Sequence, residues 1–480
     1  MDKTKQTILF MTNAELGQSS VMLAVAGELV GDAGLDIHIA SFAGLKDQVP
    51  PEVTFHTLHG KSMKDCFLDK GLEFFPRHSA GVKGAMQSYS DLLPLIMAPW
   101  EPDEHLALYD HCVQLMREIS PDTVVLDPLL GPSIDACSTL HQRNIVLSPA
   151  TFKDHVMNLQ PRGEVLWKYP VFCSGFPVPL PLSYVFTNIY LVYQLVKLAY
   201  FSPRVQALIK ARNDYGILGK MTNGYNQCDP DVLHLVPAMK QTDWPFSVIP
   251  PNVVGCGPIL PAHKPLVEID PELASWIRGR PTVVINMGSH VTYETGQADE
   301  VTAALHQCLQ LHPHIQFLWK QRKTEQLDLS SSSSVDGTLD PRIRLIPWLP
   351  STPVACLTAS DSVLAYVHHG GSNSFHESLA AGVPQVICPV WIDTYEFATR
   401  AEMLGIGIKG NEMAAPDVKA DELASALEKV LESTIEMKKM RDKARRLASE
   451  VGYLDGGRKV AADQIRKQVF QDSVRSSEKE

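Results

Sequence analysis

The densest pattern in the chain is a turn between an apolar segment and a segment of helical apolar spacing, and it reads Tyr366-Val367-His368-His369-Gly370-Gly371-Ser372-Asn373-Ser374-Phe375-His376-Glu377. Small residues at such a strand-to-helix turn let backbone N–H groups approach an anion at the helix N-terminus, where the helix dipole favours negative charge. Ser374 and Glu377 would also fit a capping box, which needs no ligand. A histidine, two glycines, an asparagine and a serine meet at this junction. Because capping needs fewer donors than these, the pattern favours an anion-binding turn.

Strand-like and helix-like segments alternate on both sides of this turn. After the middle of the chain we expect strands at 282–287, 315–319, 343–346, 362–367 and 385–389, and helices at 299–311, 374–381, 396–404 and 420–450. Before it, we expect strands at 7–12, 36–41, 123–126 and 144–147, with helices at 21–30 and 130–140. The simplest architecture for such alternation is a parallel sheet with helices on both faces. We therefore predict an α/β protein with two doubly wound, Rossmann-like sheets.

A run of prolines and glycines between residues 243 and 264 separates the two alternating regions. Such a composition cannot continue a helix and is typical of a linker. We expect a first lobe at 1–245, a linker at 246–262, a second lobe at 263–455 and a tail at 456–480 that is free to pack back on the first lobe. Residues 330–334 are all serine, and we interpret them as a loop.

The first lobe contains one long uncharged stretch, residues 171–196. Pro177, Pro179 and Pro181 interrupt it and leave roughly fifteen residues before Lys197, fewer than the ~20 that a helix needs to span a bilayer. We therefore expect an amphipathic helix at 182–200 that is buried or lies on the surface, within a region rich in proline and aromatic residues.

The composition narrows the class of protein further. The 43 Lys and Arg against 54 Asp and Glu give a net charge of −11, which argues against a nucleic-acid binder. The nine cysteines are scattered singly without a CxxC pair, so reduced thiols are expected.

Asp229-Pro230-Asp231 is interpreted as a turn, and no metal site is predicted. The polar N-terminus has no signal-peptide core, which makes the cytosol the default location.

The sequence resembles the inverting UDP-sugar-dependent glycosyltransferases, whose GT-B fold has two Rossmann-like lobes facing each other across a cleft. A donor-binding signature of about sixty residues carries the resemblance, and it comprises Trp348-Leu349-Pro350, His369-Gly370-Gly371-Ser372-Asn373-Ser374, Glu377, Gly382-Val383-Pro384, Pro389, Asp393 and Gly405-Ile406-Gly407. The overall character is most similar to fungal members that act on lipophilic small molecules. The resemblance implies a UDP-sugar co-substrate, and no resident cofactor is expected.

The resemblance also implies roles for individual residues. Trp348 would stack on uracil and Glu377 would accept hydrogen bonds from both ribose hydroxyls, while the diphosphate would lie against His369, Gly371, Asn373, Ser374 and Ser289. Asp393 and Thr394 would face the sugar. Many relatives have glutamine where this chain has Thr394, so UDP-glucose is only the default donor.

The first lobe departs from the family at the residue that would take the acceptor proton. Relatives carry a histidine after the first strand, paired with a buried aspartate, and this chain has Gln18 there while keeping Asp127. An amide cannot act as a general base at neutral pH. Three explanations are open for how the acceptor loses its proton. Asp127 could act as the base directly, another residue such as Glu15, His38, His56 or His59 could enter the site, or the acceptor could be acidic enough to ionise largely unaided. Loss of activity is a fourth possibility.

The expected function is transfer of a hexose from UDP to a hydroxyl of an apolar, phenolic or polyketide-like small molecule, with inversion. The acceptor pocket is expected to be lined partly by 152–179 and 182–200. The alternatives are a catalytically silent UDP-sugar-binding partner protein, or transfer to nitrogen or carbon. Weak membrane association is compatible with the sequence, and the oligomeric state is not determined by it.

Overall fold

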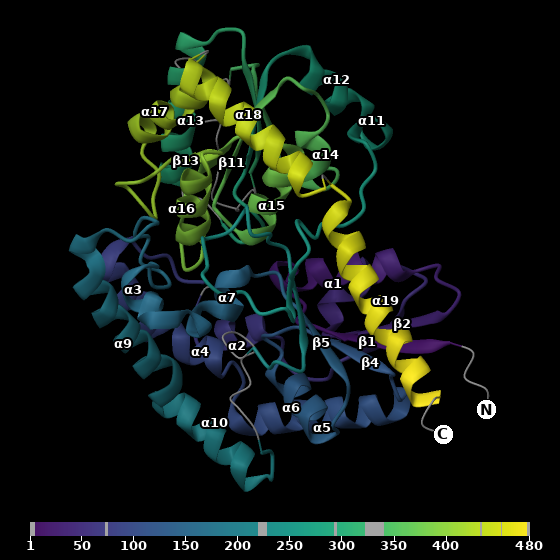
Figure 1. Cartoon of the computed structure of the whole chain (residues 1–480). Coiled ribbons are helices and arrows are strands. Elements are labelled where there is room, and N and C mark those ends of the chain that lie inside the picture. The colour runs from purple at the N-terminus through teal and green to yellow at the C-terminus, as the bar shows by residue number, and fades with distance from the viewer. Residues whose placement is uncertain are drawn as a thin grey trace.

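The computed structural model describes residues 5–72, 75–218, 228–291, 295–321, 340–432, 434–452 and 454–477. These residues form two lobes, each built on a parallel β-sheet with helices around it (Figure 1). The serine run at 330–334 lies outside the described residues.

The first lobe contains a seven-stranded sheet among the described residues, in the order β3-β2-β1-β4-β5-β6-β7, with every neighbouring pair parallel. Its strands are β1 (Gln6–Met11), β2 (Leu35–Ser41), β3 (Thr54–Thr57), β4 (Thr123–Leu126), β5 (Asn144–Leu147), β6 (Leu233–Val236) and β7 (Val253–Gly255). Its helices are α1 (Leu16–Leu29), α2 (Met63–Asp69), α3 (Gly81–Asp91), α4 (Leu93–Met97), α5 (Pro102–Ile119), α6 (Gly131–Thr139), α7 (Phe152–Val156), α8 (Glu164–Trp167), α9 (Val185–Phe201) and α10 (Pro203–Asp214). Short 3₁₀ helices are η1 (Ala43–Gln48), η2 (Met157–Leu159), η3 (Pro161–Gly163) and η4 (Leu182–Tyr184).

The two faces of this sheet are buried by different helices. Ile8 and Phe10 of β1 pack in one core with residues of α1, whereas Leu9 and Met11 pack in another with residues of α5 and α6. Successive side chains of a strand point to opposite faces, so a strand covered on both sides must be apolar throughout. This is why the short apolar runs of the sequence became central strands.

The second lobe repeats this architecture with a six-stranded parallel sheet in the order β10-β9-β8-β11-β12-β13, again among the described residues. Its strands are β8 (Thr282–Asn286), β9 (Gln316–Lys320), β10 (Ile343–Ile346), β11 (Val363–His368), β12 (Gln385–Ile387) and β13 (Gly407–Lys409). Its helices are α11 (Leu266–Ile269), α12 (Pro271–Gly279), α13 (Thr295–Leu311), α14 (Pro353–Leu357), α15 (Ser372–Ala381), α16 (Thr394–Leu404), α17 (Ala420–Leu431) and α18 (Ile435–Glu450).

Two expected boundaries differ from the structure. The segment expected as a linker contains β7, which pairs with β6 as the edge strand of the first sheet. The helix expected at 420–450 is two helices, because Thr434 ends the first run and caps α18 by accepting a hydrogen bond from the Met437 N–H. A three-residue edge strand and a polar cap are both too short for apolar periodicity to detect.

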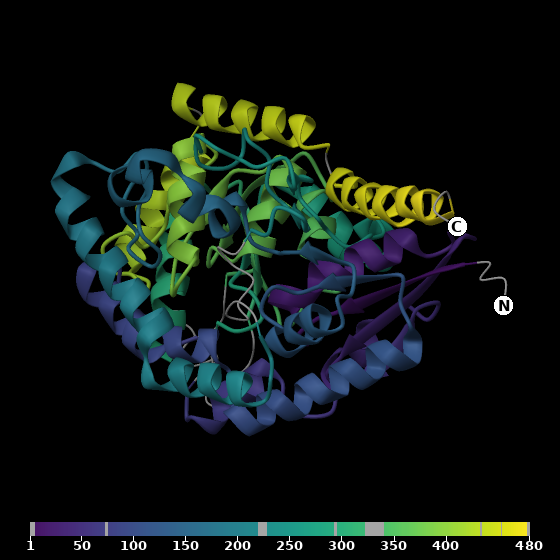
Figure 2. The same ribbon diagram turned by 60° about the horizontal axis from the view of Figure 1, so that its bottom comes forward.

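The C-terminal helix α19 (Gly456–Ser477) leaves the second lobe and lies along α1 of the first (Figure 2). Its apolar side, which includes Ala461 and Ile465, packs in the same core as β1 and α1. Arg458 binds Glu28 at 2.9 Å and Arg466 binds Asp32 at 3.2 Å. The tail therefore packs on the first lobe.

Ligand sites in open α/β sheets lie at the carboxyl ends of the strands, where the strand order reverses. That point falls between β1 and β4 in the first sheet and between β8 and β11 in the second. Across the described ranges, we find no helix with the length and apolar character needed to cross a bilayer.

Candidate functional site

The turn after β11 forms the N-terminus of α15. Gly371 occupies the N-cap and makes no side-chain capping bond, and the helix begins at Ser372. Ser374 therefore lies inside the first turn, and the capping-box interpretation is wrong. Without a side-chain cap, backbone N–H groups of this first turn are left for an anion.

Close packing around His369 explains the glycines of this turn. A Cβ on Gly371 would lie 2.5 Å from His369 Nε2, and a Cβ on Gly288, beside Ser289, would lie 2.6 Å from His369 Cε1. Gly288 also has a φ of +80°, which favours glycine. The turns after β8 and β11 thus meet at His369.

His369 is a neutral imidazole at physiological pH. Burial, together with the nearby His368, His290 and Lys320, lowers its pKa to about 3. Its Nδ1 is buried and has no hydrogen-bond partner among the described residues. The ring is therefore suited to hydrogen bonding with a phosphate oxygen through an N–H, without contributing a full positive charge.

Trp348 is not a core residue. Its side chain is 55% exposed at the end of β10. Lys320 Nζ lies 3.9 Å from the ring centroid and donates a hydrogen bond to the Gly288 carbonyl at 2.6 Å. An exposed indole held beside the β8 turn offers a flat surface to an aromatic base.

Glu377 carries an unsatisfied acceptor. Its Oε2 is buried with no hydrogen-bond partner in the described parts of the chain. Burial raises the pKa of Glu377 to about 8, against a hydrogen bond from Tyr366 that lowers it. A buried polar atom without a partner is rare in native proteins and indicates a missing ligand group.

Two other residues of the expected diphosphate site have partners within the protein. Asn373 joins the lobes, because its Oδ1 accepts a hydrogen bond from Ser20 Oγ at 3.1 Å and its Nδ2 donates to the Leu16 carbonyl at 3.2 Å. Ser374 is buried and hydrogen bonded to Tyr366. In this conformation neither side chain is directed at a free anion.

The side chain of Thr394 makes its hydrogen bonds within its own loop. It is fully buried, and its Oγ1 accepts hydrogen bonds from the N–H groups of Val390 and Trp391 at 3.1 Å each and donates to the Trp391 carbonyl. It is absent from the lining of the cavity described next. The structure thus separates Thr394 from Asp393, which does line the cavity.

A cavity of about 420 Å³ lies between the first lobe and α16. Its wall is mainly apolar, and both expected segments contribute to it: Met157, Val165, Val171 and Phe172 from 152–179, and Val192, Leu195, Val196, Ala199 and Tyr200 from 182–200.

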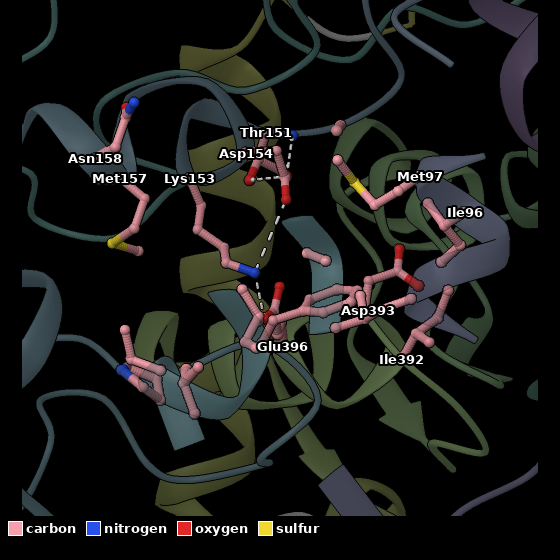
Figure 3. A pocket seen from close by; sticks show the side chains of 18 of the residues that line it. Ile96, Met97, Thr151, Lys153, Asp154, Met157, Asn158, Ile392, Asp393 and Glu396 are labelled. Carbon is pink, nitrogen blue, oxygen red and sulfur yellow. Dashed lines mark hydrogen bonds and ion pairs between the residues drawn. The ribbon is translucent and has the colours of Figure 1, made fainter. Parts of the chain in front are cut away.

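One side of the cavity carries charged groups, which Figure 3 shows around Lys153. Lys153 forms an ion pair with Glu396 across the lobes and lies 3.8 Å from Asp154 Oδ1. Burial raises the pKa of Asp393 to about 7, and the neighbouring Glu396 and Asp154 add to the shift. Burial also raises the pKa of Glu396 to about 7, although Lys153 opposes it. Three carboxyl groups therefore share one ammonium group.

Sequence reasoning missed Lys153, Asp154 and Glu396. A signal was present, since the first two follow the carboxyl end of β5 and the third follows that of β12. These are the sheet edges at which doubly wound proteins bind ligands.

Of the residues considered for proton transfer, the structure brings only Gln18 to the cavity. Gln18 lines the cavity, and its Oε1 is buried with no partner among the described residues. The other candidates, Asp127, Glu15, His38, His56 and His59, do not line it.

Asp127 holds the turn that precedes α1, the helix that carries Gln18. Its Oδ2 accepts hydrogen bonds from the backbone and side-chain N–H groups of Asn13, both at 3.0 Å, and from Thr12 Oγ1 at 3.2 Å, and its Oδ1 accepts one from the Leu129 N–H at 2.8 Å. Burial raises the pKa of Asp127, and these hydrogen bonds oppose that shift. Through these hydrogen bonds the Asp127 carboxylate, at the end of β4, connects the residues that follow β1 to those that follow β4.

The remaining candidates have other surroundings. Glu15 Oε1 accepts a hydrogen bond from the Lys64 N–H at 2.9 Å. His38 Nδ1 and His56 Nε2 are 2.8 Å apart on the neighbouring strands β2 and β3. Asp229 and Asp231 form a turn, in which the Asp231 N–H donates to Asp229 Oδ1 at 3.0 Å. Within the described ranges, no group of three or more His, Cys, Asp or Glu is arranged to hold a metal.

Residues 122–445 match the model of the UDP-glucoronosyl and UDP-glucosyl transferase family. The chain belongs to this family. Glycosyltransferase sdnJ of Sordaria araneosa is 34% identical over 450 residues, which cover 88% of this chain and 87% of that protein. UDP-glycosyltransferase stmC of Aspergillus ustus is 27% identical over 198 residues, or 38% of this chain and 36% of that one.

Solved structures confirm the two-lobed GT-B fold. The glycosyltransferase of kitacinnamycin superposes with a TM-score of 0.65 at 16% identity, covering 97% of this chain and 99% of that one. A UDP-glucosyltransferase from Polygonum tinctorium gives a TM-score of 0.65 at 17% identity, covering 98% and 99%. This chain is therefore a UDP-glycosyltransferase.

The exposure of Trp348 leads to a first prediction. Trp348→Ala should weaken UDP binding by about 1 kcal/mol or more, roughly fivefold or more, because stacking of a base on an aromatic ring contributes at least that much. Calorimetric titration with UDP measures the change. Trp167, a tryptophan of similar exposure on α8, supplies the control, and Trp167→Ala should leave the affinity unchanged. Equal affinities for the two variants would contradict a uracil-binding role for Trp348.

Proposed function

We propose that this glycosyltransferase moves a hexose, with glucose as the default, from UDP to a hydroxyl group of an apolar small molecule, with inversion at the anomeric carbon. The observation that carries the proposal is the largely apolar cavity of about 420 Å³ that Gln18 and Asp393 both line. A cavity of this size and character suits a lipophilic small molecule. The Polygonum tinctorium relative is described as capable of glucosylating indoxyl, a small aromatic acceptor.

The donor would be held by residues around the turns after β8, β10 and β11. Trp348 would receive uracil, Glu377 the ribose hydroxyls, and the N-terminus of α15 with His369 and Ser289 the diphosphate. When the bond from the anomeric carbon to UDP breaks, negative charge grows on the diphosphate. Fixed N–H donors at a helix N-terminus stabilise that charge without having to reorient.

The sugar would lie between the diphosphate turn and the cavity, within reach of Asp393. This carboxyl group occupies the N-cap position of α16 but makes no capping hydrogen bond. It is therefore available to sugar hydroxyls, and we assign it, rather than Thr394, to the sugar.

The acceptor hydroxyl would attack from the cavity, on the face of the sugar opposite UDP, which gives inversion. Gln18 Oε1 would accept the hydrogen bond of this hydroxyl and orient its oxygen. An amide does not keep the proton, so we propose that the acceptor is a phenol or a similarly acidic hydroxyl. Its proton would pass to solvent water as the new C–O bond forms and the bond from the anomeric carbon to UDP breaks. Transfer to nitrogen or carbon would need a different activation, and the mass and linkage of the product distinguish it.

The reaction is proposed to need neither a metal ion nor a resident cofactor, and to occur in the cytosol. The diphosphate charge would be stabilised by the helix terminus and its donors. We predict that activity is unchanged in excess chelator. A strict requirement for Mg²⁺ or Mn²⁺, restored on adding the ion back, would contradict this, and Asp229 and Asp231 would be the first ligands to test.

Release of UDP from UDP-glucose in the presence of a panel of phenols, sterols and polyketides tests the function. Acceptor-dependent release together with a product heavier by one hexose supports the proposal. The second candidate, a silent UDP-sugar-binding partner protein, is motivated by Gln18. Tight UDP binding without release for any acceptor would favour it.

A further inference from the structure

The outer face of η4 and α9 exposes an unusual number of large apolar side chains. Leu182, Phe186, Tyr193 and Phe201 are 87%, 85%, 62% and 67% exposed. The spacing of these four residues, together with Ile189 and Tyr190, follows one side of a helix. We call these six residues the α9 face. In both Figure 1 and Figure 2, α9 lies at the edge of the molecule with no described element on its outer side.

The charge around the α9 face differs from that of the whole chain. The protein has a net charge of −11, yet residues 165–213 contain five Lys and Arg and no Asp or Glu. Most of these basic groups are paired, as Arg204 is with Glu101 and Arg212 with Asp135. Lys197 lies on α9 itself, is exposed, and has no ion pair among the described residues. Because the other four basic groups are in ion pairs, Lys197 is the group of this segment that would attract an anionic surface to the α9 face.

The size of the α9 face argues against a second copy of the chain as its occupant. Twenty residues of η4 and α9 make a strip roughly 30 Å long and about 10 Å wide, on the order of 300 Å². A stable dimer buries roughly 800 Å² on each partner. A bilayer sets no such minimum, because an amphipathic helix lying in its surface needs only one apolar face.

The side chains of the α9 face also suit a bilayer surface. Tyr190 and Tyr193 are aromatic with a polar tip, the type of side chain enriched at membrane–water interfaces. Leu182, Phe186 and Phe201 supply the apolar groups that enter the acyl boundary. The inner side of the same helix lines the cavity, so one helix separates the cavity from the proposed membrane.

We propose that the α9 face docks on the surface of an anionic lipid bilayer, with α9 parallel to the membrane plane. The docking itself does not depend on the proposed function. It would place an apolar cavity one helix away from a phase in which apolar acceptors dissolve, and that consequence rests on the proposed acceptor class.

Flotation of the full-length chain with lipid vesicles tests the proposal. Vesicles of 70% phosphatidylcholine and 30% phosphatidylserine should carry the protein upward, and phosphatidylcholine alone should carry at least threefold less. The double variant F186S/F201S should bind the anionic vesicles at least tenfold less. A matched double variant, L311S/M413S, removes two side chains of similar exposure, 62% and 90%, on the second lobe and should float like the wild type.

Thermal unfolding and UDP affinity, measured on both double variants, separate loss of docking from loss of fold, because neither reports on lipid. A wild-type chain that stays out of the vesicle fraction would overturn the proposal, as would equal flotation of F186S/F201S and wild type. Equal binding to neutral and anionic vesicles would overturn its electrostatic part. A dimer in sedimentation that dissociates in F186S/F201S would assign the face to a second copy instead.

Discussion

Replacing Glu377 with alanine should weaken UDP binding by roughly 1.5–3 kcal/mol, about 10- to 150-fold, as measured by calorimetric titration. Glu377 Oε2 is buried without a partner in the described residues. Two adjacent ribose hydroxyls would satisfy this carboxylate, and hydrogen bonds to a charged acceptor are the stronger kind. An unchanged affinity would remove Glu377 from the donor site.

The same carboxylate should make UDP binding depend on pH. Its pKa is raised to about 8, so the protonated form predominates at pH 7. Hydroxyl donors prefer the ionised form, so UDP would lower this pKa and binding would release a proton. Affinity should therefore rise with pH up to about 8, by as much as tenfold per pH unit, and level off above it. Titrations in buffers of different ionisation enthalpy measure the released proton.

Glu377→Gln is the matched control for this second effect. It keeps the length of the side chain and one carbonyl acceptor, but it has no titrating group. We expect an affinity between those of wild type and Glu377→Ala, with no rise between pH 6 and 8. A rise that persists in Glu377→Gln would assign the released proton to another group, with Asp393 the next candidate because its pKa is about 7.

Most of the fold was predictable because buried parallel strands leave a clear signal. Ile8, Leu9, Phe10 and Met11 are apolar in succession since each face of β1 packs under different helices. Where a strand is short or lies at an edge, that signal fades. β7 has three residues at the edge of the first sheet, and the prolines and glycines of the surrounding segment predict a linker there.

The candidate site was predictable where a single turn concentrates the chemistry. His369, Gly371 and Glu377 lie within nine residues, and the structure gathers them at the N-terminus of α15. The site was less predictable where a side chain can hydrogen bond either to a ligand or to another part of the protein. The sequence offers Asn373 as a donor, but it does not show that Ser20 Oγ donates a hydrogen bond to this side chain and the Leu16 carbonyl accepts one from it, more than 350 positions away.

The ion pair of Lys153 and Glu396 shows the same limit across the lobes. Its members are 243 positions apart, and their meeting depends on how the two sheets are joined. Sequence periodicity describes each sheet separately. Sequence patterns therefore could not predict the charged side of the cavity, which depends on how the two lobes are arranged.

Turnover should depend steeply on the acidity of the acceptor, which is the second large effect we expect. No histidine lines the cavity next to Gln18, and a general base normally contributes about 10²–10⁴ in rate. Phenols, with a pKa near the ~10 of tyrosine, should therefore react at least about 10² times faster than aliphatic alcohols of similar shape. Single-turnover rates over a series of substituted phenols measure the slope. A flat series would mean that a base is present, and the cavity carboxyls Asp154, Asp393 and Glu396 would be tested for it.

Gln18→His should reduce that dependence by supplying the missing base. We expect turnover on aliphatic alcohols to rise by about 10²-fold, while the rate on the most acidic phenols changes little because these already ionise unaided. Gln18→Leu is the control: it removes the amide acceptor without adding a base, so it should slow all acceptors by a similar factor and leave the slope intact. Asp127 anchors the turn before α1 through hydrogen bonds from Thr12, Asn13 and Leu129. Because residue 18 lies in the first turn of α1, both variants keep this support. If Gln18→His leaves the slope unchanged, residue 18 does not contact the reacting hydroxyl, and the catalytic centre must lie further toward α16.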